Sequence, residues 1–272
     1  MNWILFVFVV LYVSVENARL TQGYHHNNEQ DWDILIFTQQ WPETVCKEWI
    51  HNKPSHSCVM PKQPDSWSIH GVWPTKFGTK GPGFCNRTWL FDPEQVKPIE
   101  TQLLEKWTNI EGNTGEYSLW AHEWNKHGTC AAVLEPLNSE LKYFSQGLSW
   151  GETYSMSTIL ANSGIVPDDE KLYTLTAIHN VLVVSLGVNP SIQCRHEDGK
   201  TYLVEIRVCF NKNLTLHDCD GIDRNIDVEG YGNIISNCNP AEGILYPHNK
   251  WPQKRIYVQL YKLVSWVQWL TL

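Results

Sequence analysis

The sequence has no excess of positive charge. Its 272 residues include 21 Lys and Arg against 29 Asp and Glu, a net charge of −8 at pH 7. A protein held to nucleic acid by bulk charge has the opposite balance, so this class is excluded. A locally basic cleft is still compatible with the composition, and the 11 histidines would reduce the negative charge in an acidic compartment.

Internal repeats and long low-complexity linkers are also absent, which argues against a repeat architecture. Long apolar runs are scarce. The run from Trp3 to Val13 has the length of a signal-peptide core and is short for a membrane span. We therefore predict a signal peptide over residues 1–18, cleaved near Ala18, with a signal anchor as the alternative. This places the protein in the secretory pathway.

The last residues, 251–272, form a second apolar segment of a different kind. Polar side chains at Gln259, Lys262 and Gln268 interrupt it, so we expect no stable membrane insertion. We predict that residues 19–250 form the folded domain and that the tail stands apart. The tail could be an extra strand, an amphipathic surface segment or an artefact of the gene model.

Eight cysteines in a chain with a signal peptide predict four disulfides. Only Cys209 and Cys219, which flank a strand–turn–strand pattern, can be paired from local sequence. Asn86 and Asn213 each begin an N-glycosylation acceptor triplet, as expected of surface loops in the secretory pathway.

Hydrophobic periodicity predicts both helices and strands. Strands are expected at 33–41, 66–74 and 202–210, and helices at 92–107 and 169–187, the latter capped by Asp169 and ended by Gly187. Regular β–α–β alternation is lacking. The predicted class is therefore α+β, a single disulfide-stapled domain with an antiparallel sheet and packed helices.

The segment "HEWNKHGTC" at 122–130 resembles a zinc-protease helix at first sight. Its histidines, His122 and His127, are five residues apart, whereas that motif needs a spacing of four. On a regular helix they would be rotated by about 500°, or about 140° from a common face. We therefore expect no metal at this segment.

An acid–base site fits the same segment better. Glu123 and His127 are i, i+4, and so are His122 and Lys126 on the adjacent stripe. A carboxylate, an imidazole and a positive charge suit a phosphodiester, where protons move and negative charge builds on oxygen. A solvated polar helix face is the alternative.

A second acid–base group stands in "SWSIHGVWP" at 66–74, where His70 lies between Trp67 and Trp73. A single histidine near tryptophans is more often a packed residue than a catalyst. His70 therefore becomes a candidate through its combination with the first segment.

Together, "SWSIHGVWP" and "HEWNKHGTC" resemble the two active-site segments of the ribonuclease T2 family, secreted or vacuolar/lysosomal acid endoribonucleases. "TQQWPETVC" (38–46), "GFCNRTW" (83–89) and "ILYP" near the end resemble further family segments. The resemblance covers roughly residues 30 to 250. It implies a secreted or lysosomal, endomembrane-lumen protein and agrees with the α+β class.

The resemblance also implies site residues, and each one matches a position of the family motifs. His70 and His127 match the catalytic histidines, and Glu123 the glutamate that supports His127 and the phosphorane. Lys126 matches a lysine that stabilises the transition state, His122 a phosphate-binding histidine, Trp73 a base-stacking aromatic, and Gln39 a second base subsite. The implied disulfides are Cys46–Cys58, Cys85–Cys130, Cys194–Cys238 and Cys209–Cys219.

The activity implied is cleavage of single-stranded RNA through a 2′,3′-cyclic phosphate to 3′-phosphate products. No metal or other cofactor is expected, because the nucleophile is internal to the substrate. DNA lacks the 2′-OH and should be inert. We expect a monomer. The alternative is a catalytically silent secreted binding or signalling protein on the same scaffold.

Overall fold

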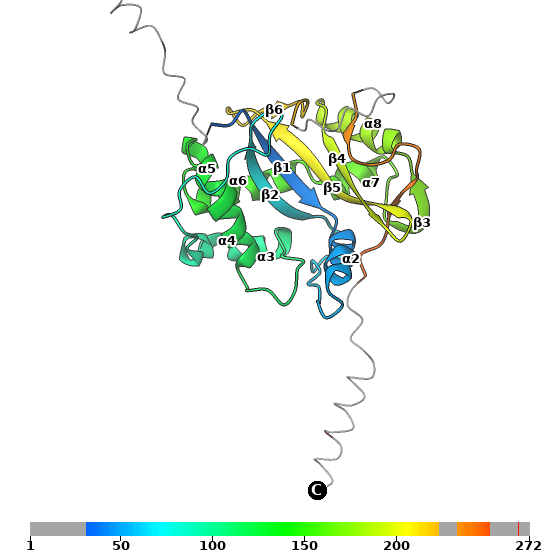
Figure 1. Cartoon of the computed structure of the whole chain (residues 1–272), viewed down its shortest axis with the longest axis horizontal. Coiled ribbons are helices and arrows are strands. Elements are labelled where there is room, and N and C mark those ends of the chain that lie inside the picture. The colour runs from blue at the N-terminus through cyan, green and yellow to red at the C-terminus, as the bar shows by residue number, and fades with distance from the viewer. Residues whose placement is uncertain (1–30, 223–232, 251–265, 267–272) are drawn as a thin grey trace, which may run out of the picture.

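The described part of the chain is built around one eight-stranded sheet (Figure 1). The computed structural model describes residues 31–222, 233–250 and 266, so the predicted signal peptide at 1–18 and all of the tail except Trp266 lie outside it. Among these residues, no helix combines the length and the apolar character needed to cross a bilayer.

The sheet is mainly antiparallel. Its central order is β2-β1-β5-β4-β7, with β6 and β8 also paired to β5 and with β3 paired to β8. Two short pairs, β4 with β7 and β5 with β8, are parallel. The strands are β1 Ile34–Gln40, β2 Ser68–Thr75, β3 Asp168–Tyr173, β4 Ser191–Glu197, β5 Lys200–Phe210, β6 Leu216–His217, β7 Ile235–Ser236 and β8 Ile244–Tyr246.

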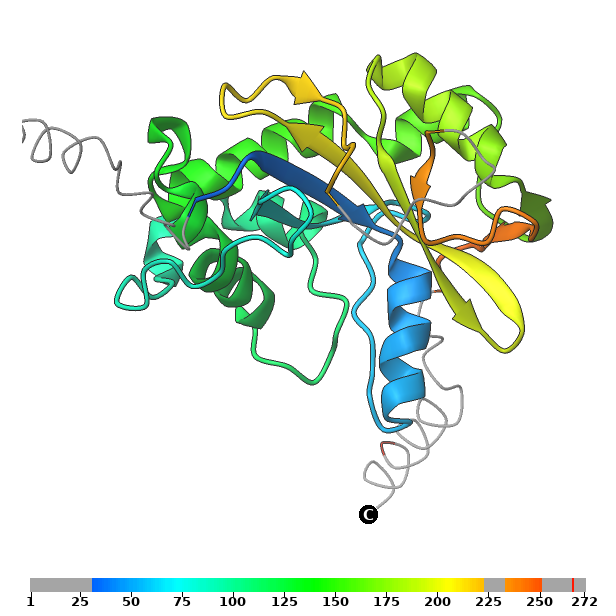
Figure 2. The same ribbon diagram turned by 45° about the horizontal axis from the view of Figure 1, so that its top comes forward.

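Helical segments connect these strands. The α-helices are α2 Pro42–Asn52, α3 Glu100–Lys106, α4 Ser118–Glu123, α5 Thr129–Ala131, α6 Glu140–Thr153, α7 Met156–Asn162 and α8 Leu175–Leu186. Two 3₁₀ helices, η1 Pro93–Ile99 and η3 Glu135–Leu137, and one π-helical turn, η2 Trp124–Gly128, complete them. In Figure 2, β1 runs directly into α2, which leads the chain away from the sheet.

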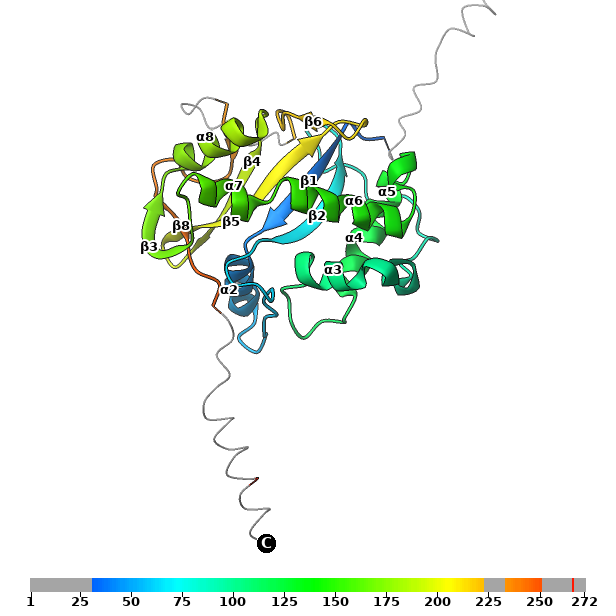
Figure 3. The ribbon, with the colours of Figure 1, turned by 180° about the vertical axis from the view of Figure 1, so that it is seen from behind.

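Helices α6 and α7 cover one face of the sheet. They lie in front of the central strands in Figure 3 and behind them in Figure 1. Trp150 of α6 stacks on Phe210 of β5 at 3.9 Å between ring centroids and lies 5.8 Å from Phe37 of β1. Because side chains alternate along a strand, the residues next to Phe37 and Phe210 point to the other face.

Two predicted helices differ from the observed ones. Asp92 accepts a hydrogen bond from the Glu94 amide as expected, but the segment begins as 3₁₀ helix and becomes α-helical only after Pro98. Asp169 is not a helix cap, because 168–173 is strand β3, paired with β8. The cap of α8 is Thr174, whose hydroxyl accepts from the Ala177 amide, while the expected Gly187 ends the helix at φ 73°.

The four disulfides join the pairs that the resemblance implied, Cys46–Cys58, Cys85–Cys130, Cys194–Cys238 and Cys209–Cys219. Asn86 and Asn213 are exposed, each beside or within a turn, so both acceptor triplets are accessible. Glycosylation itself stays a prediction.

Candidate active site

His70 reaches the site through a β-bulge. In the pairing of β1 with β2, Gly71 opposes Thr38 and Ile69 opposes Gln39, so His70 is the extra residue between them. In a regular strand, His70 would oppose Gln39 and point toward α6. A bulge re-aims the side chain, and His70 lies instead on the face away from α6.

The second segment carries a π-helical turn. Residues 124–128 follow α4 as a single π turn, in which hydrogen bonds join residues five apart. The extra residue brings His122 and His127 together, with ring centroids 6.1 Å apart. Gly128 is needed there, since a Cβ would lie 2.3 Å from the Trp124 ring.

The indole of Trp73 lies beside both candidate catalytic histidines. Its ring centroid lies 5.0 Å from that of His70 and 5.7 Å from that of His127. Its Nε1 donates a hydrogen bond of 2.8 Å to Oε2 of Glu123. Gly71 permits this contact, because a Cβ at that position would lie 2.1 Å from both of the bonded atoms.

The site separates the protonation states of the two histidines. Burial, together with the nearby charges of Lys126 and His122, lowers the pKa of His127 to about 2. Desolvation alone would lower the pKa of His70, but its hydrogen bond to Glu205 and the charge of that carboxylate raise it above the usual value. At mildly acidic pH, His127 is therefore neutral while His70 carries a proton.

Glu123 is 1% exposed, and this burial raises its pKa to about 7 against the lowering effects of His70, Trp73 and Lys126. The pKa of His122 is lowered by burial and by Lys126. His127 Nδ1 is buried and has no hydrogen-bond partner in the described part of the chain. Burial thus favours the uncharged forms of His122, Glu123 and His127.

The expectation of no metal at this segment stays a prediction, but the regular-helix geometry on which it relied is corrected. Ligand atoms of His122, Glu123 and His127 all lie within 4.8 Å of one another, a group that could hold a metal ion. The spacing argument assumed a regular helix, and the π turn removes the rotation on which it relied. Whether a metal takes part in the reaction is a separate question, which chelation answers.

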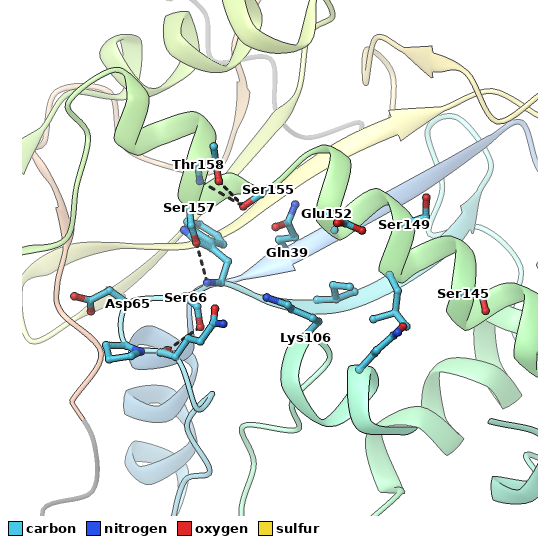
Figure 4. Close-up of a pocket in the computed structure, with 17 residues that line it drawn as sticks. Gln39, Asp65, Ser66, Lys106, Ser145, Ser149, Glu152, Ser155, Ser157 and Thr158 are labelled. Carbon is cyan, nitrogen blue, oxygen red and sulfur yellow. Dashed lines mark hydrogen bonds between the residues drawn. The ribbon is translucent and has the colours of Figure 1, made fainter. Parts of the chain in front are cut away.

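Gln39 is the candidate that the structure places elsewhere. Its Nε2 donates to the Tyr154 carbonyl at 2.8 Å and its Oε1 accepts from the Met156 amide at 3.3 Å. The side chain therefore ties the α6–α7 junction and borders a separate pocket of about 740 Å³ on the helix-covered side (Figure 4). Its neighbour Gln40, paired with Glu205, points to the face of the histidines.

Two charged residues of the site were missed from the sequence. Glu205 lies 2.7 Å from His70 Nδ1, and Arg207 donates to Glu205 and lies 5.5 Å above the Trp73 ring. The available signal was a glutamate and an arginine two residues apart in the otherwise apolar strand "TYLVEIRVCF". Charged residues are rarely buried unless paired, so this pattern marks a candidate site.

The Cys85–Cys130 disulfide ties the loop after β2 to the end of the π turn. Beside it, the Phe84 amide donates to the Lys126 carbonyl at 2.9 Å, although Phe84 has a φ of 55°. These two links join the loop after β2, the strand of His70, to the helical segment that contains His127. They thereby limit how far His70 and His127 can separate.

Two histidine rings that both lie beside the Trp73 indole, together with a buried carboxyl group, are typical of an acid–base site. The sequence comparisons agree. A model of the ribonuclease T2 family matches residues 32–219. Ribonuclease Oy of Magallana gigas is 38% identical over 195 residues, 70% of this chain and 89% of that protein. Ribonuclease T2 of Sus scrofa is 36% identical over 194 residues, 70% of this chain and 90% of that protein.

Solved structures show the same relationship. Human RNase T2 aligns with a TM-score of 0.63 and 31% identity, over 79% of this chain and 98% of that one. RNase NT in complex with 5′-AMP aligns with a TM-score of 0.63 and 28% identity, over 80% of this chain and all of the other. The chain therefore belongs to the ribonuclease T2 family and is an endoribonuclease.

Proposed function

We propose that the enzyme cleaves single-stranded RNA by transphosphorylation, with His127 as general base and His70 as general acid. His127 removes the proton of a ribose 2′-OH, and the 2′-oxygen forms a bond to phosphorus. The bond from phosphorus to the 5′-oxygen breaks, and His70 gives that oxygen its proton. The products are a 2′,3′-cyclic phosphate and a free 5′-OH.

The second step reverses these roles. His70, now neutral, takes a proton from water as the water attacks phosphorus, and His127 returns its proton to the 2′-oxygen. The cyclic phosphate opens to a 3′-phosphate. The observation that carries this assignment is the 2.7 Å contact of His70 Nδ1 with the Glu205 carboxylate, which favours protonated His70, whereas buried His127 Nδ1 has no such partner in the described part of the chain.

The other groups serve the phosphorane in this proposal. Below about pH 7 the Glu123 carboxyl holds a proton, which it can donate to a phosphoryl oxygen while its Oε2 accepts from Trp73. Lys126 offsets the negative charge of the transition state, and the His122 ring donates a hydrogen bond to a phosphoryl oxygen. Trp73 is proposed to stack on a base with the part of its ring that remains exposed.

Product analysis tests the reaction class directly. A short RNA and its all-DNA counterpart are incubated with the mature protein at mildly acidic pH in EDTA, and the products are weighed by mass spectrometry. We expect cleavage of RNA alone, with 2′,3′-cyclic phosphate ends, because DNA lacks the internal nucleophile. Loss of activity in EDTA that zinc restores would replace this mechanism by one using the His122–Glu123–His127 group.

The pH dependence of kcat/KM follows from the two shifts. His70 must be protonated, and its pKa lies above 6.5, so activity should fall at alkaline pH beyond that value. His127 must be neutral, which holds above about pH 2. We expect kcat/KM to stay nearly constant across the mildly acidic range and to fall along an alkaline limb. A rate that rises steadily into the alkaline range would contradict the two-histidine scheme.

We further propose that the protein acts as a monomer in the lumen of the secretory or lysosomal system or outside the cell. The four disulfides and the predicted signal peptide support an oxidising compartment. The rival function is a binding or signalling protein that retains the scaffold without turnover. Absence of RNA cleavage by folded protein in the same experiment would favour it.

A further inference from the structure

His70 is held by a carboxylate from a different strand. Its Nδ1 lies 2.7 Å from Oε1 of Glu205, while Oε2 of Glu205 accepts from Nε of Arg207 at 3.1 Å and from Nη2 at 2.8 Å. We propose that Glu205, clamped by Arg207, is a positioning residue that fixes the His70 ring and leaves its Nε2 to carry the transferred proton. The proposal rests on the proposed function, because it concerns the support of the acid in that reaction.

The strand geometry brings these residues together across β1. Strands β2 and β5 flank β1, so their backbones are about 10 Å apart. Glu205 and Arg207 are two residues apart and share the face away from α6. The bulge turns His70 to the same face. The side chains of His70 and Glu205 are long enough to meet across β1.

Arg207 completes the pairing of the buried Glu205 carboxylate. Glu205 is only 8% exposed, and a buried unpaired carboxylate would be strongly destabilising. Both of its oxygens are occupied, one by His70 and the other by Arg207, so the carboxylate cannot rotate without losing a partner. A histidine whose Nδ1 is bound in this way keeps one tautomer and one ring orientation.

The charged and titratable groups around His70 come from two sides. From β5 come Glu205 and Arg207, and from the helical segment come Glu123, His122 and His127. Glu205 is the group in direct contact, and the His70 pair lowers its pKa to about 2, against the effect of its burial. The ion pair is therefore formed throughout the mildly acidic range, where the acid must hold its proton.

Two substitutions distinguish a positioning role of Glu205 from a general effect on protein stability. In Glu205→Gln we expect the alkaline limb of kcat/KM to move down by about one pH unit or more, because the ion-pair partner is lost. At a pH well above the limb, this variant should lose about tenfold in kcat/KM for each pH unit by which the limb moves. In Arg207→Met the alkaline limb of kcat/KM should not move to lower pH. Glu205 keeps its charge, and the positive charge of Arg207, which lowers the His70 pKa, is removed. Its kcat should fall because the carboxylate is no longer clamped.

The matched control is Glu242→Gln. Glu242, in the exposed segment between β7 and β8, also lies beside a histidine, at 3.5 Å from His196 of the exposed β4–β5 hairpin. We expect its profile to equal that of the unchanged enzyme. A general effect of removing a carboxylate next to histidine would appear in both variants, whereas positioning of the acid appears only at Glu205.

An NMR titration of the His70 ring provides a readout independent of turnover. In the full protein, Glu205→Gln should lower the His70 pKa and Arg207→Met should not. A folded Glu205→Gln variant with an unchanged alkaline limb and an unchanged ring titration would overturn the proposal. If Glu205→Gln does not fold, Arg207→Met provides the test. A lowered His70 pKa in Arg207→Met would then overturn the proposal. Failure of the proposed function would appear differently, as an unchanged enzyme that cleaves no RNA.

Discussion

Replacement of His127 by alanine is expected to lower kcat for RNA cleavage by a factor of about 10²–10⁴, the usual contribution of a general base. The neutral imidazole is available across the working pH range, because burial and the neighbouring Lys126 and His122 hold its pKa at about 2. Alanine leaves no group at that place to remove the 2′-OH proton. Steady-state kinetics on a defined RNA measures the effect.

Binding should survive the His127 replacement. A 2′-O-methyl oligonucleotide cannot cyclise, so its dissociation constant reports binding without turnover, and we expect a change within about threefold. His196→Ala is the matched control, since His196 is exposed on the β4–β5 hairpin and belongs to no part of the site. A decrease in kcat of less than tenfold for His127→Ala would remove His127 from the role of base.

Gly71→Ala adds one methyl group, and we expect it to lower activity more than any other such addition near the site. Its Cβ would lie 2.1 Å from both Oε2 of Glu123 and Nε1 of Trp73. One of these side chains must move, which breaks their 2.8 Å hydrogen bond and shifts groups beside both histidines. We expect kcat/KM to fall by about 10², the size of effect that an ångström-scale misplacement causes.

The same substitution should also reduce the free energy of unfolding by about 1–3 kcal/mol, the usual cost of overpacking. Denaturant titration beside the kinetics separates the two effects, because activity is measured well below the unfolding transition. Gly115→Ala is the control, since its Cβ would meet nothing nearer than the Ser118 Cβ at 3.9 Å. Near-normal kcat/KM in Gly71→Ala would show that Glu123 and Trp73 need not touch.

The two replacements examine different requirements of one site. His127→Ala removes a reacting group and leaves its surroundings, whereas Gly71→Ala leaves every reacting group and disturbs their spacing. If Trp73 only stacked on a base, Gly71→Ala would act mainly through KM. An additional decrease in kcat would show that its hydrogen bond to Glu123 supports the chemistry.

Much of this protein could be predicted from local sequence. Period-two apolar residues in 202–210 predicted β5, and Asp92 followed by Pro93 predicted a capped helical start. The histidine-containing motifs and the eight cysteines led to the family and to the disulfide pairs. These features succeed because hydrophobic period, capping and motif composition depend on residues that are close together in the chain.

The tertiary structure decided the rest. It placed Asp169 in a strand through pairing with β8, and it directed Gln39 toward α6 while His70 turned the other way at a bulge. It brought His122 beside His127 through an inserted π-turn residue. Bulges and π turns add one residue to a regular repeat, and the repeat itself does not show where that residue falls.

The contact between Glu205 and His70 was likewise decided by the tertiary structure. Glu205 is 135 residues away in sequence, and only the order β2-β1-β5 places it within reach. The amino-acid sequence by itself determined which reacting groups are present and which family scaffold carries them. The structure alone decided their partners and protonation, because both depend on burial and on charges contributed by distant strands.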